Sequence, residues 1–266
     1  MTTIIPAADQ NPDPEHDRHF VTALARGLTV LSAFRPGEST LTNQQLSART
    51  GLPKSTVSRL THTLTCLGYL SQDPDTGRYR PGLAALVLSS SMLASFDVRG
   101  VAAPLMRAFA MEHTISVSLG MLDGSDIVYL ETCRSLAKVS VQLTVGSRVP
   151  LATTAIGRAC YSGLPETEQQ RLKPLLQQRY AHDWPRMEEK LDQALAAYRA
   201  QGFCASFGDY EADVMAVGVA LPSLSPGQPA MSLNASGPAF AFSAEQMQQG
   251  IAPALQILRD RILPRS

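Results

Sequence analysis

The chain has 266 residues, a length that favours about two domains at the usual ~150 residues per domain. Hydrophobic residues make up 44% and charged residues 17%, so the chain can bury a core and is not disordered throughout. No apolar run approaches the ~18 residues of a membrane-spanning helix, and the first residues show no secretory signal. We therefore expect a cytoplasmic protein that makes no membrane contact.

Basic residues are concentrated in one segment of a chain whose formal net charge is zero. Residues 20–82 contain seven Lys and Arg residues against three acidic residues, an excess of four. Residues 1–18 are instead polar and acidic with three prolines, and we expect them to form a disordered tail. A basic segment in a neutral chain is typical of a module that binds a polyanion.

The basic segment predicts three helices followed by a hairpin. Apolar residues recur at helical spacing between 20 and 34, a short helix runs from Thr42 to Thr50 before Gly51, and a third helix runs from Pro53 to Leu67. Residues 69–72 and 78–81 predict two short strands around a turn at 73–77. This order is typical of a winged helix-turn-helix.

The third helix has one apolar face and one polar, basic face. At about 100° per residue, Val57, Leu60 and Leu64 lie on one side. The helix contains no Asp or Glu, and its other side carries small hydroxyl residues, an arginine and a histidine. Small hydroxyl side chains allow close approach to DNA, and arginine bonds guanine in the major groove. This face predicts DNA binding through Ser55, Thr56, Ser58, Arg59 and His62.

Four further cations are candidates for contacts with the DNA backbone. Lys54 lies at the start of the third helix, where the helix N-terminus also favours a phosphate. Arg78 and Arg80 flank the turn of the predicted wing, and Arg26 lies in the first helix. The residues leave open the alternative of a metabolite sensor whose N-terminal domain binds a protein partner.

The rest of the chain predicts a second domain of mixed structure. Helices at 83–96 and 98–113 carry apolar stripes that suit either a core or a dimer seam. From 115 to 145 the apolar period changes to two, which predicts strands. Helices are then predicted at 154–163, 166–179, 187–201 and 244–262, with strands near 203–207, 214–221 and 230–235. Strands mixed with helices favour an α+β fold.

The sequence does not favour an enzyme. It contains no Gly-x-Ser-x-Gly, Walker, Gly-x-Gly-x-x-Gly or His-Glu-x-x-His motif. The four cysteines are far apart and form no C-x-x-C pair, so we expect neither a disulfide framework nor a metal site, and no cofactor. A hydrolase that uses the Cys160 thiol is the remote alternative, because no histidine lies at a recognisable spacing from it.

Several segments resemble IclR-type bacterial transcription regulators. They are residues 26–31 (RGLTVL), 46–60 (LSARTGLPKSTVSRL), 146–151 (GSRVPL), 154–159 (TAIGRA) and 236–238 (SGP). The resemblance covers roughly residues 20–260. It implies a winged helix-turn-helix at 19–82, a linker helix at 83–97 and a GAF-like effector-binding domain at 98–266. It also implies dimers or tetramers on palindromic operators, with a small organic acid as effector.

An effector site is predicted where residues 150–157 follow a strand and open a helix with small side chains. Open N–H groups and the helix dipole favour an anion there, so a carboxylate would bind near Thr154, Ala155 and Ile156. The resemblance adds Asn234 and Ser236, which alternate on one strand and can both point inward.

The resemblance also places pocket walls at Ser206 and at Met215 with Ala216. Family members often have an acidic residue near position 206 and a glycine near position 213, whereas this chain has Ser206 and Asp213. An apolar wall of Met215 and Ala216 predicts an effector that is larger or more hydrophobic than a two-carbon acid.

Overall fold

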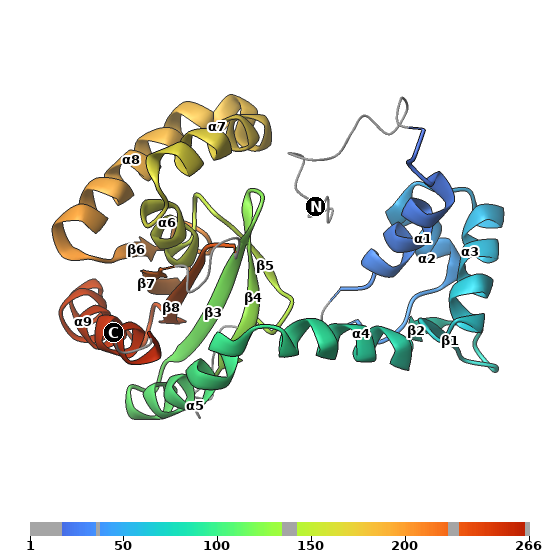
Figure 1. Cartoon of the computed structure of the whole chain (residues 1–266), viewed down its shortest axis with the longest axis horizontal. Coiled ribbons are helices and arrows are strands. Elements are labelled where there is room, and N and C mark those ends of the chain that lie inside the picture. Colours follow the sequence, from blue (N-terminus) through green and yellow to red (C-terminus); the bar gives the residue numbers. More distant parts are fainter. Residues whose placement is uncertain (1–17, 36–37, 135–142, 223–228, 264–266) are drawn as a thin grey trace. The chain divides into compact units, whose positions relative to one another are not determined.

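The computed structural model describes residues 18–35, 38–134, 143–222 and 229–263. These residues form two compact units, the first ending at Phe96 and the second beginning at Asp97. Each unit is described separately below (Figure 1). Residues 1–17 of the expected disordered tail and residues 135–142 of the expected alternating stretch lie outside the described residues.

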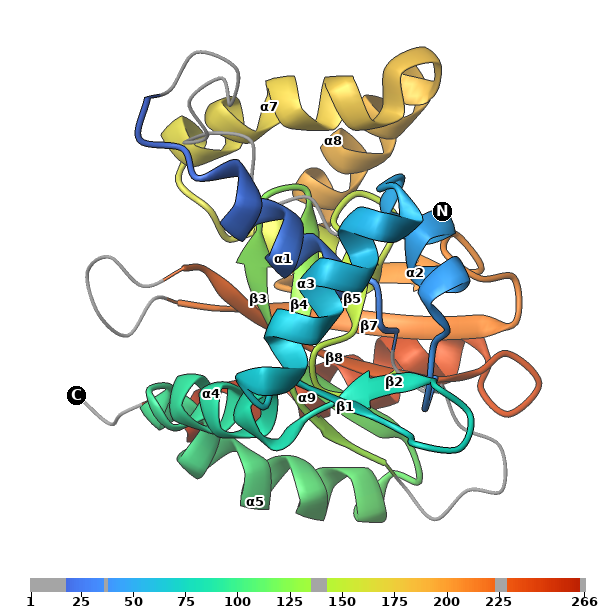
Figure 2. The same ribbon diagram turned by 90° about the vertical axis from the view of Figure 1, so that its right-hand side faces the viewer.

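The first unit consists of three helices, a two-stranded hairpin and a further helix. These are α1 (Thr22–Ser32), α2 (Asn43–Thr50), α3 (Lys54–Cys66), β1 (Leu70–Gln72), β2 (Tyr79–Pro81) and α4 (Leu83–Ala94). Figure 2 shows α3 packed beside α1, with the hairpin following α3. The order is the winged helix-turn-helix that the sequence predicts.

Local hydrogen bonds define the helix and hairpin ends in this unit. Thr42 and Gln45 form a capping box at the start of α2, and Gly51 ends α2 in the left-handed conformation at φ 69°. In the hairpin turn, Asp73 Oδ1 accepts hydrogen bonds from the N–H groups of Asp75 (3.1 Å) and Thr76 (2.8 Å). Short-range bonds of this kind are why the sequence predicted these boundaries within one or two residues.

The core of the first unit is small. Its buried members come from all three helices, the hairpin and the segment before α2: Val30, Leu41, Leu46, Val57, Leu70 and Tyr79. Leu24 and Leu28, which belong to the apolar repeat of α1, are instead 62% and 54% exposed, because the buried positions of α1 are Gly27 and Val30. Much of the apolar surface of α1 therefore has no cover within this unit.

Helix α4 buries none of its side chains. It carries no charged residue, and its exposed apolar side chains are Leu83, Leu86, Val87, Leu88 and Met92. Of the two interpretations that its sequence leaves open, a core helix is therefore wrong for this unit. By length and composition, no single described helix meets the requirement for a bilayer span, and α4 meets it only as a broken pair with α5 (Asp97–Glu112).

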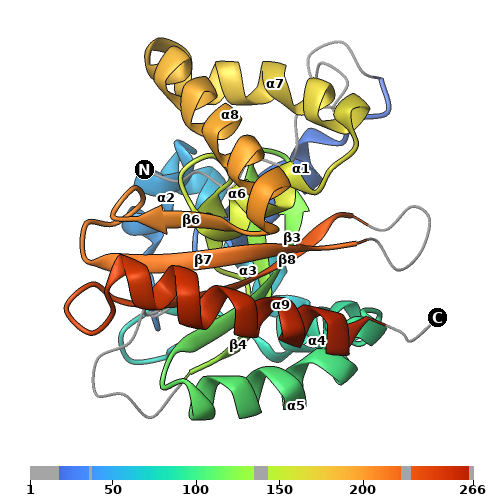
Figure 3. The ribbon, with the colours of Figure 1, turned by 90° about the vertical axis from the view of Figure 1, so that its left-hand side faces the viewer.

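The second unit is built on a six-stranded antiparallel sheet in the order β5-β4-β3-β8-β7-β6 (Figure 3). The strands are β3 (Ser116–Asp123), β4 (Asp126–Cys133), β5 (Arg148–Pro150), β6 (Cys204–Phe207), β7 (Val214–Leu221) and β8 (Met231–Pro238). Because β8 pairs with both β3 and β7, this last strand joins the β5-β4-β3 half of the sheet to the β7-β6 half.

Helices cover both faces of this sheet. One face carries α5 (Asp97–Glu112) and α9 (Ala252–Ile262), the latter preceded by a π-helical turn, Gln246–Ile251 (Figure 3). The other face carries α6 (Ala155–Ser162), which packs on β6, β7 and β8. Helices α7 (Glu166–Tyr180) and α8 (Trp184–Gln201) lie outside α6. The predicted effector site at the start of α6 is therefore held against the middle of the sheet.

Candidate functional site

The polar face of α3 is solvent-exposed, as the sequence predicts. Lys54, Ser55, Ser58, Arg59 and His62 are exposed and Thr56 is half-buried. On the opposite side Val57 is fully buried in the core, so the helix is fixed by its apolar face. No acidic residue interrupts α3, so the exposed face presents hydroxyl groups, a guanidinium and an imidazole together.

Several of the predicted DNA-contact residues line one groove between α1 and α3. The groove has a volume of about 980 Å³ and is lined by Arg26, Thr56, Ser58, Arg59 and His62 together with leucines of both helices. Lys54, Ser55, Arg78 and Arg80 are not part of this lining. The structure thus brings Arg26 together with the α3 residues, a relationship that α1 alone could not reveal.

The two wing arginines differ. Arg80 is exposed, whereas the half-buried Arg78 bonds within its own domain. Its Nε donates to Thr40 Oγ1 at 2.7 Å and its Nη2 donates to the Thr40 carbonyl at 3.1 Å. Arg78 therefore secures the wing to the segment before α2, and Arg80 is the wing cation that remains extended to solvent.

A cavity of about 30 Å³ lies in the second unit at the start of α6. Six of the predicted effector-site residues line it, namely Thr154, Ala155, Ser206, Ala216, Asn234 and Ser236. Its remaining lining residues are Tyr129, Leu143, Val149, Tyr210, Glu211 and Val214. Segments from α6, β4, β6, β7 and β8 therefore converge on one site.

Two predicted effector residues do not line the cavity. Side chains alternate along β7, so Val214 and Ala216 face the cavity while Met215 does not. The Ile156 side chain packs in the core with Ile127, Val149 and Cys160. The apolar wall is therefore built by Val214 and Ala216. Met215 no longer supports the prediction of a larger or more hydrophobic effector.

Hydroxyl groups hold the start of α6 in place. Thr154 Oγ1 accepts a hydrogen bond from Gly157 N at 3.1 Å and donates to the Pro150 carbonyl at 2.6 Å. Ser206 Oγ donates to the Thr153 carbonyl at 2.9 Å. The first N–H groups of a helix have no acceptor within that helix, so the Ala155 N–H is a main-chain donor at the cavity.

The aromatic residues of the cavity were not found from the sequence. Tyr129 lies on β4, which β3 separates from β8, so its approach to Asn234 depends on the strand order. Burial raises the pKa of Tyr129, and contacts with Asn234 and Ser118 oppose that rise. The phenol therefore stays neutral, and Asn234 Oδ1 is buried with no hydrogen-bond partner among the described residues.

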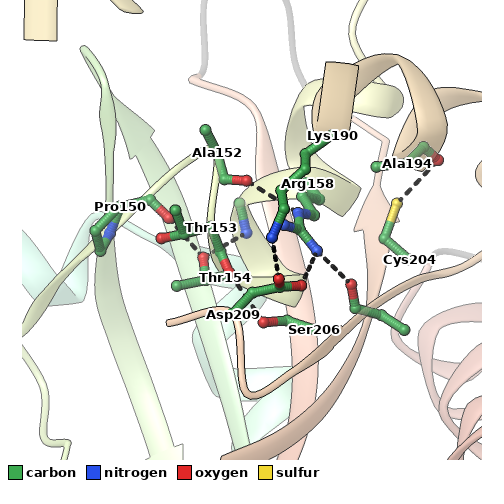
Figure 4. Close-up of polar contacts among 12 residues, drawn as sticks. Pro150, Ala152, Thr153, Thr154, Arg158, Lys190, Ala194, Cys204, Ser206 and Asp209 are labelled. Atoms are coloured by element: carbon green, nitrogen blue, oxygen red, sulfur yellow. Dashed lines mark hydrogen bonds and ion pairs between the residues drawn. The ribbon is translucent and has the colours of Figure 1, made fainter. Parts of the chain in front are cut away.

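An ion cluster lies directly behind the start of α6 (Figure 4). Arg158 is 5% exposed, and its Nη1 donates to Asp209 Oδ2 at 2.7 Å while Lys190 Nζ bonds Asp209 Oδ1. Burial raises the pKa of Asp209, but the bonds from Lys190 and Arg158 outweigh it and hold the pKa below its usual value. Asp209 therefore stays ionised at neutral pH.

The buried thiols have no features of a nucleophile. Burial raises the pKa of Cys160 to about 12 and that of Cys204 to about 11, so neither forms a thiolate near neutral pH. Within the described ranges, no three His, Cys, Asp or Glu side chains form a group that could hold a metal ion.

Comparison with known proteins identifies both units. The model of the IclR helix-turn-helix domain matches residues 23–74, and that of the bacterial transcriptional regulator IclR C-terminal domain matches residues 90–260. The HTH-type transcriptional regulator TsaQ1/TsaQ2 of Comamonas testosteroni is 32% identical over 98% of this chain and 93% of its own length.

Solved structures show the same architecture. An IclR family transcriptional regulator from Brucella abortus is 37% identical, with a TM-score of 0.79 over 96% of this chain and 97% of its own. An IclR homologue from Microbacterium hydrocarbonoxydans, in complex with 4-hydroxybenzoate, has the same fold at 24% identity, a TM-score of 0.68 and coverage of 91% and 97%. This family comprises transcription regulators and not enzymes. The chain belongs to the IclR family of DNA-binding transcription regulators, with a C-terminal ligand-binding domain.

Proposed function

We propose that this regulator binds a palindromic operator through the exposed face of α3 and the β1–β2 wing. The observation that carries the proposal is the acid-free face of α3, exposed opposite a fully buried Val57. Arg59, Ser58 and His62 would meet base edges, while Lys54 and Arg80 would meet phosphates. In this assignment residues 19–82 form the DNA-binding domain, residues 83–97 the linker and residues 98–266 the effector domain.

Self-association of the chain follows from α4 and is part of the proposal. A twelve-residue helix without charge and without a buried side chain is a poor surface for a monomer. Pairing α4 with α4 of a second copy would remove the exposed leucines from water and would place two α3 helices on one duplex. A palindromic operator then mirrors the symmetry of the dimer.

The effector in this proposal is a small organic acid. Its carboxylate would lie at the start of α6, where the Ala155 N–H and the helix dipole favour an anion. Asn234 and Ser236 of β8 would bond its polar groups, and Tyr129 would pack against its body. The structural relative that contains 4-hydroxybenzoate makes this aromatic acid the first probe.

The effector would act by a population shift. An acid that binds two dimer arrangements with unequal affinity changes the spacing of the α3 helices and so the affinity for the operator. A coupling of ~1–3 kcal/mol would change that affinity about 5–150-fold.

The test begins with selection of randomised duplex DNA by the full-length protein. The selected duplex is then titrated with protein in the presence of 4-hydroxybenzoate, benzoate and pyruvate. The proposal requires an enriched palindrome and a change in its affinity with at least one acid. Absence of enrichment at low ionic strength would contradict DNA binding, and an affinity that none of the acids alters would contradict the acid effector.

A further inference from the structure

The loop between β6 and β7 contributes to the effector cavity but is not itself part of the sheet. It comprises residues 208–213, and Tyr210 and Glu211 within it line the cavity. Its base is closed by two backbone bonds, from Gly208 N to the Val214 carbonyl and from Val214 N to the Glu211 carbonyl, each 3.0 Å. The position of Tyr210 and Glu211 therefore depends on what fixes the outer part of this loop.

Asp209 connects this loop to two helices. One carboxylate oxygen accepts from Arg158 of α6 and the other bonds Lys190 of α8 (Figure 4). Both partners are distant in sequence, 51 and 19 residues away. Asp209 directly precedes Tyr210, so these bonds hold this part of the loop against α6, the helix whose first residues line the cavity.

The Arg158 side of this connection is rigid. Its Nε donates to the Ala152 carbonyl and its Nη1 donates to the Ala205 carbonyl, both at 2.9 Å. Ala152 lies two residues before Thr154, and Ala205 lies next to Ser206, so the same guanidinium also fixes both of these cavity segments. A buried guanidinium that loses its carboxylate partner is unfavourable, which stabilises the closed loop.

The cavity is narrow with the loop in this position. A volume of about 30 Å³ accommodates water but not an organic acid. Binding of an organic acid therefore requires an outward shift of the lining side chains, and the loop 208–213 is a wall that side-chain ion pairs hold at the cavity. A ligand contacts Tyr210 and Glu211 only in molecules whose loop lies at the cavity, which is the closed position of the loop.

We propose that Asp209 is a positioning residue for effector recognition. By bridging Arg158 and Lys190 it holds Tyr210 and Glu211 at the cavity and sets the fraction of molecules with a closed site. This inference rests on the proposed effector-binding function of the cavity. It predicts that loss of the Asp209 charge lowers apparent affinity in proportion to the closed fraction, about ten-fold if that fraction falls to about a tenth.

The test compares Asp209→Asn, Asp209→Glu and Lys190→Gln with the wild type in the full-length protein. Lys190→Gln is the milder variant, because it leaves the bond between Arg158 and Asp209 in place. It still tests the connection if Asp209→Asn does not fold. The matched control is Glu188→Gln, which removes another carboxylate–lysine pair of α8, to Lys173 at 3.1 Å, away from the cavity. The two readouts are amide hydrogen exchange of residues 207–214 and calorimetric titration with 4-hydroxybenzoate.

The inference expects faster exchange in residues 207–214 of Asp209→Asn, a smaller increase in Lys190→Gln, and recovery in Asp209→Glu. Affinity for 4-hydroxybenzoate should fall about ten-fold in Asp209→Asn and stay unchanged in Glu188→Gln. Equal loop exchange in wild type and Asp209→Asn overturns the inference whether or not an acid binds. Faster loop exchange with unchanged affinity overturns it too. A wild type that binds none of the acids contradicts the proposed effector instead, and loop exchange then decides the role of Asp209.

Discussion

Arg78 Nε donates to Thr40 Oγ1 at 2.7 Å, so the wing arginine with the more buried side chain is bonded to its own domain. The structure therefore distinguishes Arg78 from Arg80, although the sequence predicts the same DNA contact for both. Arg78→Ala should lower the free energy of unfolding by about 1 kcal/mol, because two hydrogen bonds to Thr40 are lost. Chemical denaturation of both arginine variants measures this difference, with Arg80→Ala expected to leave stability unchanged.

Arg80→Ala should instead act on DNA binding. Removal of one phosphate contact lowers affinity for all duplexes similarly and reduces the slope of log K against log salt by about 1. Titrations of a selected and a random duplex at several salt concentrations give both quantities. A salt slope that Arg80→Ala leaves unchanged would exclude Arg80 from the interface.

Arg59→Ala should weaken binding to the selected operator by ~1–3 kcal/mol and relax the base preference at one position. Lys54→Ala should weaken all sequences about equally, because Lys54 lies at the helix start where a phosphate is expected. A suitable control is Arg186→Ala, which removes an exposed arginine of α8 in the other unit. Equal losses on operator and random DNA for Arg59→Ala would reassign Arg59 to a phosphate contact.

The contribution of Asp209 to stability should depend on pH in one direction. Its pKa is lowered in the folded chain by Lys190 and Arg158, so its stabilising contribution is present above the ordinary value of 3.8 and is lost as pH falls through the folded value. The free energies of unfolding of wild type and Asp209→Asn, measured in urea, should therefore differ near pH 6 and converge only as pH falls below 3.8 through the lower folded value. A difference that stays constant across this range would contradict the ion pairs as its source.

Only one of the four thiols should react in the folded protein at neutral pH. Cys66 is exposed on α3, whereas Cys133, Cys160 and Cys204 are buried. Burial also raises the pKa of each of the three buried thiols. Titration with an aromatic disulfide should therefore modify Cys66 alone, with the others reacting after unfolding, and Cys66→Ser should abolish the native reaction.

Gly157→Ala should destabilise the second unit by ~1–3 kcal/mol. A Cβ at this position would lie 2.3 Å from the Leu151 carbonyl oxygen and 2.5 Å from Leu151 Cα, and backbone cannot move aside easily. Gly100→Ala is the control, since nothing lies within 4 Å of its Cβ and it should gain about 0.5–1 kcal/mol from helix propensity. Thermal unfolding of the two variants should move in opposite directions.

The sequence by itself determined the elements whose causes are local. The glycine that ends α2 at Gly51, the capping box of Thr42 and Gln45, and the Asp73 turn each act over a few residues, so helix and hairpin positions could be predicted. The motif around Thr154 and Ala155 likewise predicted an effector site at the start of α6, and in the structure both residues line a cavity there.

The tertiary structure decided what depends on pairing between distant segments. The phase of β7 puts Ala216 and not Met215 at the cavity, and the strand order brings Tyr129 to Asn234 across β3. The bond from Arg158 to Asp209 joins residues 51 apart. Side-chain periodicity identifies which residues share a face, but which face meets a cavity depends on how strands and helices pack, and that is settled by long-range burial and charge pairing.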